Sequence, residues 1–329
     1  MWKDIRQIVW KLIALMLPFF VLLPLYCKFF PMYYLDEEYA MYRQQKDYVT
    51  GKLNIDNRQA RVLILGDSRT KAGFRPDLLW DGAYNIALGG ATPIEGYYSL
   101  KEYLEYHKPP EAVVIAYAPM HYMDVDTLWT RSVYFHTLSE DDFHDLIKRA
   151  EEFEDTENIR IENFELEYWM HKLYMPNKYA TALKKSAFVM RHEKTSKKYD
   201  AMVEFKGYST YGTAEQSGDI NGEAKVSDFA DSDIITWYLE EMFDLCREQG
   251  IKVVLEQAPM NETSYRILTP EFKASYRSYM FRIATEHPDI LICPDFYCYP
   301  NDCFGDADHL NAHGVEVYDA FLMEKYRDL

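Results

Sequence analysis

Val62-Leu63-Ile64-Leu65-Gly66-Asp67-Ser68 joins an uninterrupted apolar run to the tripeptide Gly-Asp-Ser. Four consecutive apolar residues before a turn-forming glycine are typical of a buried strand in a parallel sheet. A hydroxyl that follows such a strand emerges at the carboxyl edge of the sheet, where ligands of open α/β sheets bind. Ser68 is therefore a candidate nucleophile, although Gly-Asp-Ser is also an ordinary turn sequence.

A second short sequence near the C-terminus, Asp306-Ala307-Asp308-His309-Leu310-Asn311, could activate that serine. A serine hydroxyl is a poor nucleophile by itself and usually needs an imidazole base that is oriented by a carboxylate. His309 supplies the imidazole, and Asp306, three residues earlier, supplies the carboxylate. Asp308, next to the histidine, is the rival carboxylate. The two sequences together predict a triad of Ser68, His309 and one of these two carboxylates.

Backbone donors for an oxyanion are predicted around a glycine pair. Thr92 and Glu95 have the spacing of a capping box, and Pro93 falls at the first helical position, so a helix begins here. Gly89 and Gly90 then lie in the turn before that helix, where backbone N–H groups can stabilise developing negative charge. The alternative is that the two glycines only permit a tight turn.

These blocks resemble those of the SGNH/GDSL hydrolase superfamily. The membrane-anchored branch is the most similar, and it includes the D-alanyl-lipoteichoic acid biosynthesis protein and alginate-type O-acetylation proteins. The resemblance covers about residues 61–120 and 231–329. It implies that Ser68 is the nucleophile, that His309 acts as general base and acid, and that Asp306 orients the histidine.

The resemblance also implies an oxyanion hole made by the N–H groups of Ser68 and Gly90, with Asn85 ending the strand before the glycine turn. One block departs from the family pattern. Most members carry an asparagine after the third strand, whereas here Ala112–Tyr117 runs into Ala118-Pro119-Met120-His121. His121 and Asn261 are candidates for the missing donor, unless both are ordinary loop residues. The possible substrate-site residues are therefore Asp67, Asn85, Gly89, His121 and Asn261.

The first 35 residues predict a membrane anchor. Lys3, Arg6 and Lys11 precede the apolar run from Leu12 to Cys27, and acidic residues follow it at 36–38. This charge asymmetry predicts a cytoplasmic N-terminus and an extracytoplasmic remainder. No small-x-small cleavage motif follows the run, which favours an uncleaved signal anchor. Prolines within the run indicate a kinked helix, which is tolerated where neighbouring helices satisfy the backbone, so we expect a membrane partner.

Composition limits the remaining possibilities. The net charge of −17 argues against a nucleic-acid partner. Neither a Cys-x-x-Cys pair nor a histidine doublet is present, so neither a metal site nor a cofactor is predicted. Cys293, Cys298 and Cys303 cluster in one loop-rich segment, and outside the cell they would allow one disulfide with one thiol left over.

Residues 36–329 are predicted to form one SGNH-like catalytic domain with a helical insert at about 121–225. Strands that alternate with helices predict a three-layer α/β/α sandwich with a parallel sheet, of the SGNH or flavodoxin-like type. The insert is too long for a simple loop and is expected to form a helical cap over the active-site edge. The predicted strands are 62–65, 112–117, 251–255 and 290–292, and the predicted helices are 93–107, 139–154, 161–173, 179–190, 232–249 and 312–326.

The expected protein is thus a single-pass, outward-facing serine acyltransferase for O-acetyl or D-alanyl groups. Its acceptor would be a cell-envelope or secreted polysaccharide or a teichoic acid, and the resemblance implies a membrane-bound O-acyltransferase as its partner. Two alternatives stay open. One is a carbohydrate esterase or deacetylase. The other is a non-catalytic partner of an O-acyltransferase, which the missing asparagine favours.

Overall fold

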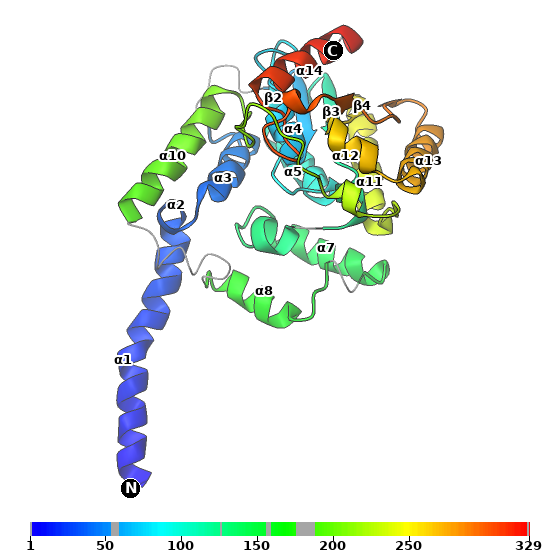
Figure 1. The fold of residues 1–329 in the computed structure, drawn as a ribbon. Coiled ribbons are helices and arrows are strands. Elements are labelled where there is room, and N and C mark those ends of the chain that lie inside the picture. Colours follow the sequence, from blue (N-terminus) through cyan, green and yellow to red (C-terminus); the bar gives the residue numbers. More distant parts are fainter. Residues whose placement is uncertain (1, 54–58, 126, 156–158, 176–187, 328) are drawn as a thin grey trace.

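The structure of the chain, a computed structural model, describes residues 2–53, 59–125, 127–155, 159–175, 188–327 and 329. It is a mixed α/β fold in which many helices surround a parallel sheet of five strands (Figure 1). One apolar N-terminal helix projects away from this body. The mixed α/β class with a parallel sheet that the sequence predicts is confirmed.

The sheet has the strand order β2-β1-β3-β4-β6, and every pair of neighbours is parallel. The order reverses between β1 and β3, so the carboxyl ends of these two strands form the switch point where ligands of such sheets bind. Each predicted strand agrees with an observed one to within one or two residues. The bounds are β1 Val62–Gly66, β2 Ala83–Asn85, β3 Ala112–Ala116, β4 Lys252–Glu256 and β6 Leu291–Ile292.

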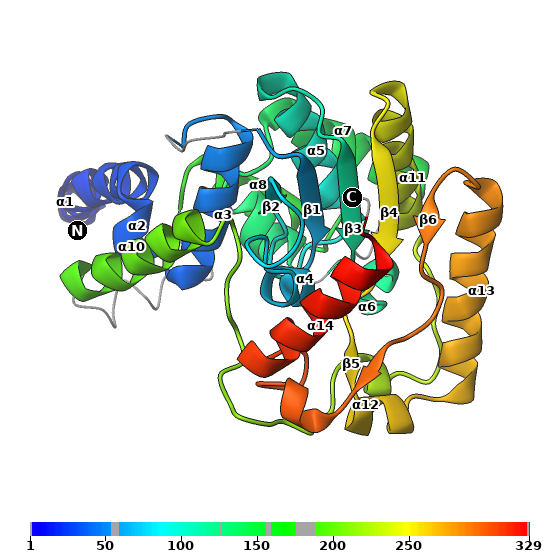
Figure 2. The same ribbon diagram turned by 90° about the horizontal axis from the view of Figure 1, so that it is seen from above.

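Both faces of the sheet are buried, because alternate side chains of each strand point to opposite faces. Leu63 and Leu65 enter one apolar cluster, and Val62 and Ile64 enter another. Figure 2 shows α5 and α11 behind the strands and α14 in front. The first cluster also holds residues of α3 (Glu37–Val49), α5 (Pro93–Tyr106), α11 (Asp233–Glu248) and α13 (Pro270–Glu286), and the second holds residues of α14 (Ala312–Lys325).

The helix that follows the glycine pair begins as the sequence predicts. Thr92 caps α5, its side chain accepts from the Ile94 N–H, and the Glu95 carboxylate accepts from the Thr92 N–H at 2.8 Å. Pro93 occupies the first turn, where its missing N–H removes no helical hydrogen bond. The capping box thus fixes the point at which the chain turns from β2 into α5.

The insert contains η1 (Leu128–Val133), α7 (Glu140–Glu152), α8 (Phe164–Lys172) and α10 (Phe188–Glu204). Stacked aromatic rings join α7 to α8, such as Phe143 with Tyr168. In contrast, α10 packs on α3 and on the short helix α2 (Pro31–Tyr34). Two of the predicted insert helices match α7 and α8. The third, 179–190, lies mostly outside the described residues, which resume at the start of α10.

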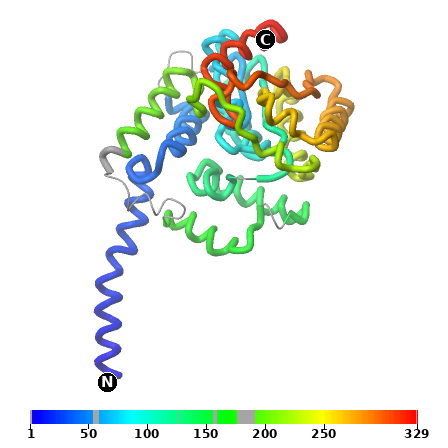
Figure 3. The backbone as a smooth tube through the Cα atoms, in the orientation of Figure 1, coloured from blue at the N-terminus to red at the C-terminus, as the bar shows by residue number. Residues whose placement is uncertain are grey.

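Helix α1 (Trp2–Phe29) leaves the body as a single long rod, which the backbone tube in Figure 3 shows plainly. Its 28 residues are long and apolar enough to cross a membrane, and its apolar window is not buried against the rest of the protein. Only Cys27, near its end, is buried. The prediction of an N-terminal apolar helix is confirmed, and the two prolines lie inside it.

The C-terminal third contains elements that the sequence patterns do not predict. β5 (Met260–Asn261) pairs in parallel with β7 (Cys298–Tyr299) in a separate two-stranded sheet. Both strands are too short to show a residue alternation. The remaining short helices are α4 (Ser68–Gly73), α6 (Met120–Met123), η2 (Glu223–Lys225), α12 (Glu262–Ile267) and η3 (Asn301–Cys303).

The expected disulfide is absent, because all five cysteines of the chain are free thiols. Cys293 is buried, and its Sγ lies 2.9 Å from the Tyr297 hydroxyl, whereas Cys298 is exposed on β7. Cys303 is held in η3 beside Asp302. The three cysteines that lie close together in the sequence therefore form no disulfide, since each thiol belongs to a different local element.

Candidate active site

Asp67 fixes the position of Ser68. Its Oδ1 accepts from the N–H groups of Arg69 and Thr70, which makes Asp67 the N-cap of α4. Its Oδ2 accepts from the Ala118 N–H at 2.7 Å. This fully buried carboxylate therefore ties the end of β1 to the chain that leaves β3 and places Ser68 at the first position of the helix.

Gly66 is required by the close approach of β3. A Cβ at this position would lie 2.0 Å from the carbonyl oxygen of Ala116. The Thr70 hydroxyl donates to the same carbonyl, which holds α4 against β3. In the Gly-Asp-Ser tripeptide, Gly66 thus allows close packing, Asp67 caps the helix, and Ser68 presents its hydroxyl.

His309 lies between Ser68 and Asp306. The distance from His309 Nε2 to Ser68 Oγ is 2.8 Å, and Nδ1 lies 2.9 Å from both carboxylate oxygens of Asp306. Burial acts to raise the pKa of Asp306, but hydrogen bonds and charge from His309 outweigh burial and hold the pKa below its ordinary value. An ionised carboxylate can only accept, so Nδ1 carries a proton and Nε2 is left to accept from Ser68.

The two rival carboxylates face different partners. Asp308 does not contact the imidazole, and its Oδ1 accepts from Arg69 Nη2 at 2.6 Å. The same guanidinium donates to Glu223 at 2.7 Å. Burial acts to lower the pKa of Arg69, but Glu223 and Asp308 raise it above its ordinary value, so Arg69 stays charged. The geometry favours Asp306 over Asp308 as the partner of His309, which is the choice that the resemblance implies.

Among the described residues, two backbone N–H groups at the serine have no hydrogen-bond acceptor. Within the part of the chain that the structure describes, neither Ser68 nor Gly90 donates its N–H to another group. Gly90 adopts a φ of 73°, and a Cβ there would meet Thr127 Oγ1 at 2.6 Å, so glycine is required. The Gly89 N–H differs, because it donates to the sulfur of Met41 at 3.3 Å. The geometry therefore leaves Ser68 and Gly90 as the donors that a ligand oxygen could use.

Two expected substrate-site residues have structural tasks instead. Asn85 is fully buried, and its amide donates to the carbonyls of Thr70 and Phe74. Asn261 caps α12, and its amide donates to the carbonyl of Ala307 at 2.8 Å. Neither asparagine borders the cavity beside Ser68. The expectation that they contact a substrate is corrected, because backbone groups use up their amides.

His121 remains at the site. It lies on α6, just beyond β3, and its Nε2 is 3.5 Å from Asp67 Oδ2. His121 and Gly89 both border the cavity that contains Ser68. Asp67, which was also expected at the substrate, is fully buried and does not line the cavity, so that expectation is corrected. Of the two candidates for the missing oxyanion donor, His121 is thus the one whose side chain can reach a ligand in the cavity.

A cavity of about 710 Å³ opens beside Ser68 and His309. The insert contributes to its wall through residues of α6, η1, α10, η2 and the loops beside them, whereas the described residues of α7 and α8 contribute none. Arg131 of η1 pairs with Glu38 and donates to the Gly89 carbonyl at 3.0 Å. The charged residues that line the cavity are Glu37, Glu38, Arg69, Asp124, Arg131, Lys198, Glu223 and Asp308.

Tyr211 is a site residue that the sequence patterns do not identify. Its ring stacks on the His309 imidazole with centroids 4.7 Å apart, and its hydroxyl contacts the sulfur of Met41 at 2.8 Å. The stack is possible because Gly212 and Gly305 pack back to back, and a Cβ on Gly212 would lie 2.4 Å from the Gly305 carbonyl carbon. The sequence feature that could have identified Tyr211 as a site residue is Gly212, the glycine that follows it.

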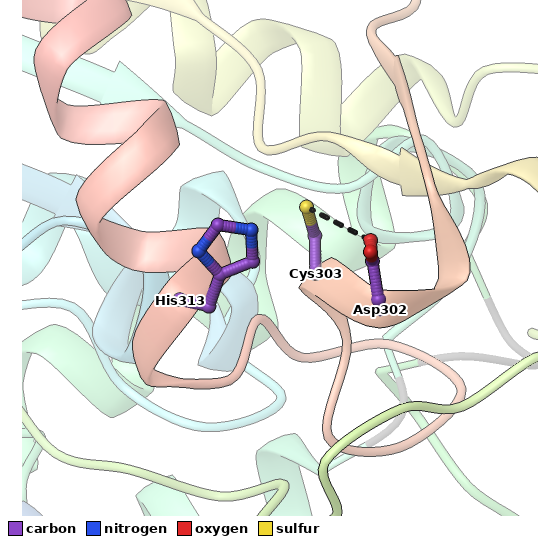
Figure 4. Close-up of side chains that lie close together, drawn as sticks. All are labelled: Asp302, Cys303 and His313. Carbon is purple, nitrogen blue, oxygen red and sulfur yellow. Dashed lines mark hydrogen bonds between the residues drawn. The ribbon is translucent and has the colours of Figure 1, made fainter.

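Two other clusters of side chains could hold a metal ion among the described residues, and neither borders the Ser68 cavity. Figure 4 shows the first, in which Cys303 lies between Asp302 and His313. Burial, followed by the charge of Asp302, raises the pKa of Cys303 to about 11. The thiol thus keeps the proton that a metal would have to displace. The second cluster is Glu240, Glu286 and His287.

Comparison of the chain with known protein families and with curated proteins found no match. The functional assignment therefore depends on the geometry around Ser68.

Proposed function

We propose that this protein is a serine acyltransferase that carries an acetyl or D-alanyl group on Ser68 and passes it to a hydroxyl of a cell-envelope or secreted polysaccharide or of a teichoic acid. The observation that carries the proposal is the contact of 2.8 Å between His309 Nε2 and Ser68 Oγ, with Asp306 on the other ring nitrogen. This is the arrangement by which a base activates a serine.

In the first half-reaction, Ser68 Oγ attacks the carbonyl carbon of the acyl donor while His309 Nε2 takes the hydroxyl proton. The oxygen of the tetrahedral intermediate accepts from the N–H groups of Ser68 and Gly90, with the His121 ring as a candidate third donor. His309 then returns the proton to the leaving oxygen or sulfur. The product is an ester on Ser68, and Asp306 stabilises the imidazolium that forms on the way.

In the second half-reaction, an acceptor hydroxyl gives its proton to His309 and attacks the ester carbon. Ser68 Oγ leaves and regains the proton from His309. The lining of the cavity supports a polyhydroxylated acceptor, since carboxylates accept hydrogen bonds from hydroxyl groups. Glu223 is fully buried, and its Oε1 has no hydrogen-bond partner among the residues that the structure describes. Protein atoms cover this oxygen, so an acceptor hydroxyl can reach the exposed carboxylates of the lining, such as Asp308, and not Glu223.

The same proposal assigns the fold to the SGNH/GDSL superfamily, with a three-layer, flavodoxin-like arrangement. Two observations support it. The strand order β2-β1-β3-β4-β6, with every pair parallel, is the flavodoxin-like order. Alternate strand residues also enter two separate apolar clusters, one on each face. The second face has the thinner cover, because α14 is the main helix in its cluster.

The proposal places the N-terminus in the cytoplasm and the body outside the membrane. Support comes from Lys3, Arg6 and Lys11 before the apolar part of α1 and from the acidic N-terminal turn of α3 after it. By resemblance, a membrane-bound O-acyltransferase would deliver the acyl group. The serine chemistry does not depend on this partner.

The test is covalent labelling of Ser68 in the full-length protein. A fluorophosphonate or an activated acetyl ester should modify Ser68, and mass spectrometry of the peptides locates the adduct. Ser68→Ala should abolish the adduct. Ser209→Ala is the control, because the Ser209 hydroxyl has no hydrogen-bond partner among the described residues and so lacks the base that Ser68 has in His309. Failure to label Ser68 in folded protein would overturn the enzyme proposal in favour of a non-catalytic partner.

A second measurement separates transfer from hydrolysis. The acyl-enzyme is isolated, and its decay is followed with and without a soluble oligosaccharide or glycerol acceptor. An acyltransferase should give the acylated acceptor in preference to free acid. Release of free acid alone, at a rate that the acceptor does not change, would identify an esterase.

A further inference from the structure

A second hollow, of about 350 Å³, lies where α1 ends and the body begins. We call it the α1 hollow. Aromatic rings and cations line it, and no aspartate or glutamate is among its described lining residues. The whole chain has 53 acidic and only 36 basic side chains, so a wall with cations alone favours an anionic ligand. The cations are Lys28, Arg43, Lys46 and Lys52, and the rings include Tyr34, Tyr39, Tyr134 and Tyr174.

Two of these cations are already neutralised from outside the hollow. Arg43 pairs with Asp47 at 2.7 Å, and Lys46 pairs with Glu102 at 2.6 Å. Lys28 and Lys52 are different, because neither forms an ion pair with any residue in the described ranges. Both side chains are exposed. The unpaired positive charge of the hollow therefore comes from these two lysines.

The wall beside Lys28 is built of stacked rings. The Lys28 ammonium lies 5.2 Å from the centre of the Tyr174 ring, and His136 stacks on the same ring at 4.0 Å. His136 adopts a φ of 56°, a conformation that its packing must hold. Burial, followed by the charges of His171 and Lys28, lowers the pKa of His136 to about 3. This imidazole is therefore neutral and can donate a hydrogen bond without adding charge.

The hollow lies where a bilayer surface would meet the protein. Lys28 is in the last turn of α1, directly after the apolar run from Leu12 to Cys27. Figure 1 shows α8 level with the last turns of α1, and Figure 2 shows the body to one side of α1. α8 and its C-cap residue expose three large apolar side chains at i, i+3 and i+7, with Trp169 54% exposed. Tryptophan is enriched at membrane interfaces. The three residues are Leu166, Trp169 and Leu173.

We propose that the α1 hollow binds the phosphate group of a lipid in the leaflet nearest the body, with Lys28 and Lys52 contacting the phosphate. The acyl chains of that lipid would continue along α1 and beneath α8. A lipid phosphate at this level supplies the negative charge that the wall lacks. The inference rests on the membrane span in the proposed function, and it does not depend on chemistry at Ser68.

The test uses the full-length protein in nanodiscs of phosphatidylcholine with a minor fraction of phosphatidylglycerol. After extraction into mild detergent, native mass spectrometry counts the phosphatidylglycerol molecules that stay bound. Wild type should retain one molecule, and Lys28→Gln/Lys52→Gln should lose most of this retention. Lys108→Gln/Lys148→Gln is the control, since it removes the same charge from two exposed lysines elsewhere. Equal retention in both double variants would overturn the proposal.

The same samples distinguish the source of the phosphate and the two proposals. Displacement of the lipid by millimolar inorganic phosphate or glycerol phosphate would identify a site for soluble phosphate and overturn the lipid assignment. Failure of the wild type to insert into nanodiscs would overturn both the span and the lipid site. Ser68 labelling is measured in parallel. Loss of labelling with retention intact would contradict only the serine chemistry, and loss of retention with labelling intact would contradict only the lipid site.

Discussion

The Ser68 cavity and the α1 hollow are both lined by charged side chains, but they balance charge differently. In the Ser68 cavity, Arg69 pairs with Glu223 and Asp308, and Arg131 pairs with Glu38. Lys198 forms no ion pair among the described residues, but it shares the lining with five carboxylates. The α1 hollow keeps two lysines without a carboxylate partner among the described residues. Charges that are paired within the fold hold reacting groups in a fixed geometry, whereas unpaired charges of one sign favour a ligand of the other sign.

The largest effect is expected from a comparison of the two carboxylates that flank His309 in the sequence, Asp306 and Asp308. Asp306→Asn should lower kcat/KM on a small activated ester by about 10⁴-fold, because an amide no longer holds Nδ1 protonated. Asp308→Asn should cost less than about tenfold, since Asp308 is partly exposed and Arg69 keeps Glu223. Steady-state kinetics on the two purified variants measures the ratio. A larger loss from Asp308→Asn would show that the triad is wrongly assigned.

A smaller effect is expected from the packing that supports His309. Gly212→Ala places a Cβ 2.4 Å from the Gly305 backbone and should push Tyr211 off the imidazole. Displacement by about 1 Å can cost roughly 10²-fold in rate. Gly73→Ala is the matched control, because its Cβ would make an ordinary contact of 3.5 Å with Leu310. Equal activity of both variants would mean that the stack does not position His309.

The parts of the site that lie in short local sequences could be predicted. Ser68 follows a buried strand, Gly90 precedes a capped helix, and Asp306 lies one turn before His309, so each position follows from neighbouring residues. The same holds for the parallel strands, whose apolar runs are continuous. The sheet could therefore be predicted from the sequence itself, whereas the relation between Ser68, His309 and Asp306 was implied by the resemblance to the SGNH/GDSL blocks.

Residues that join distant segments could not be predicted. Arg131 reaches Glu38 across 93 positions, and Tyr211 reaches Met41 across 170. Neither contact leaves a period or a motif in the sequence. Asn85 and Asn261 failed for the opposite reason, because polar residues past strand ends look functional although backbone carbonyls use their amides. Sequence patterns thus indicate the type and position of such residues but not the groups that their side chains contact.

A buried lysine on α4, the helix that begins at Ser68, can be compared with the exposed lysines of the α1 hollow. Lys71 on α4 is fully buried, and its Nζ has no hydrogen-bond partner among the described residues. Burial, followed by the charge of Lys198, lowers the pKa of Lys71 to about 7. An unpaired lysine in the interior therefore loses its proton near neutrality, whereas the exposed lysines of the hollow can stay in contact with water and lipid.

This difference predicts a pH-dependent effect on stability. Folded Lys71 releases its proton near pH 7 and the unfolded chain near 10.5, so the unfolded chain binds more protons between these values. The contribution of Lys71 to the free energy of unfolding therefore rises with pH between about 7 and 10.5. Lys71→Met should raise the free energy of unfolding by about 1–4 kcal/mol below pH 7, and the gain should shrink towards pH 10. Thermal unfolding at pH 6, 8 and 10 measures it, and a gain independent of pH would contradict the prediction.

The smallest expected effect concerns the face of α8 beside the α1 hollow. Trp169→Ser should change the free energy of unfolding by no more than about 0.5 kcal/mol, because the ring is 54% exposed and supports little of the fold. Trp237→Ser is the contrast, since Trp237 packs on Arg149 at 4.7 Å and should destabilise the body. In vesicles that contain brominated lipids, wild-type emission should be quenched more than that of Trp169→Ser. Equal quenching, together with shielding of Trp169 from aqueous acrylamide, would mean that a protein covers this face instead of lipid.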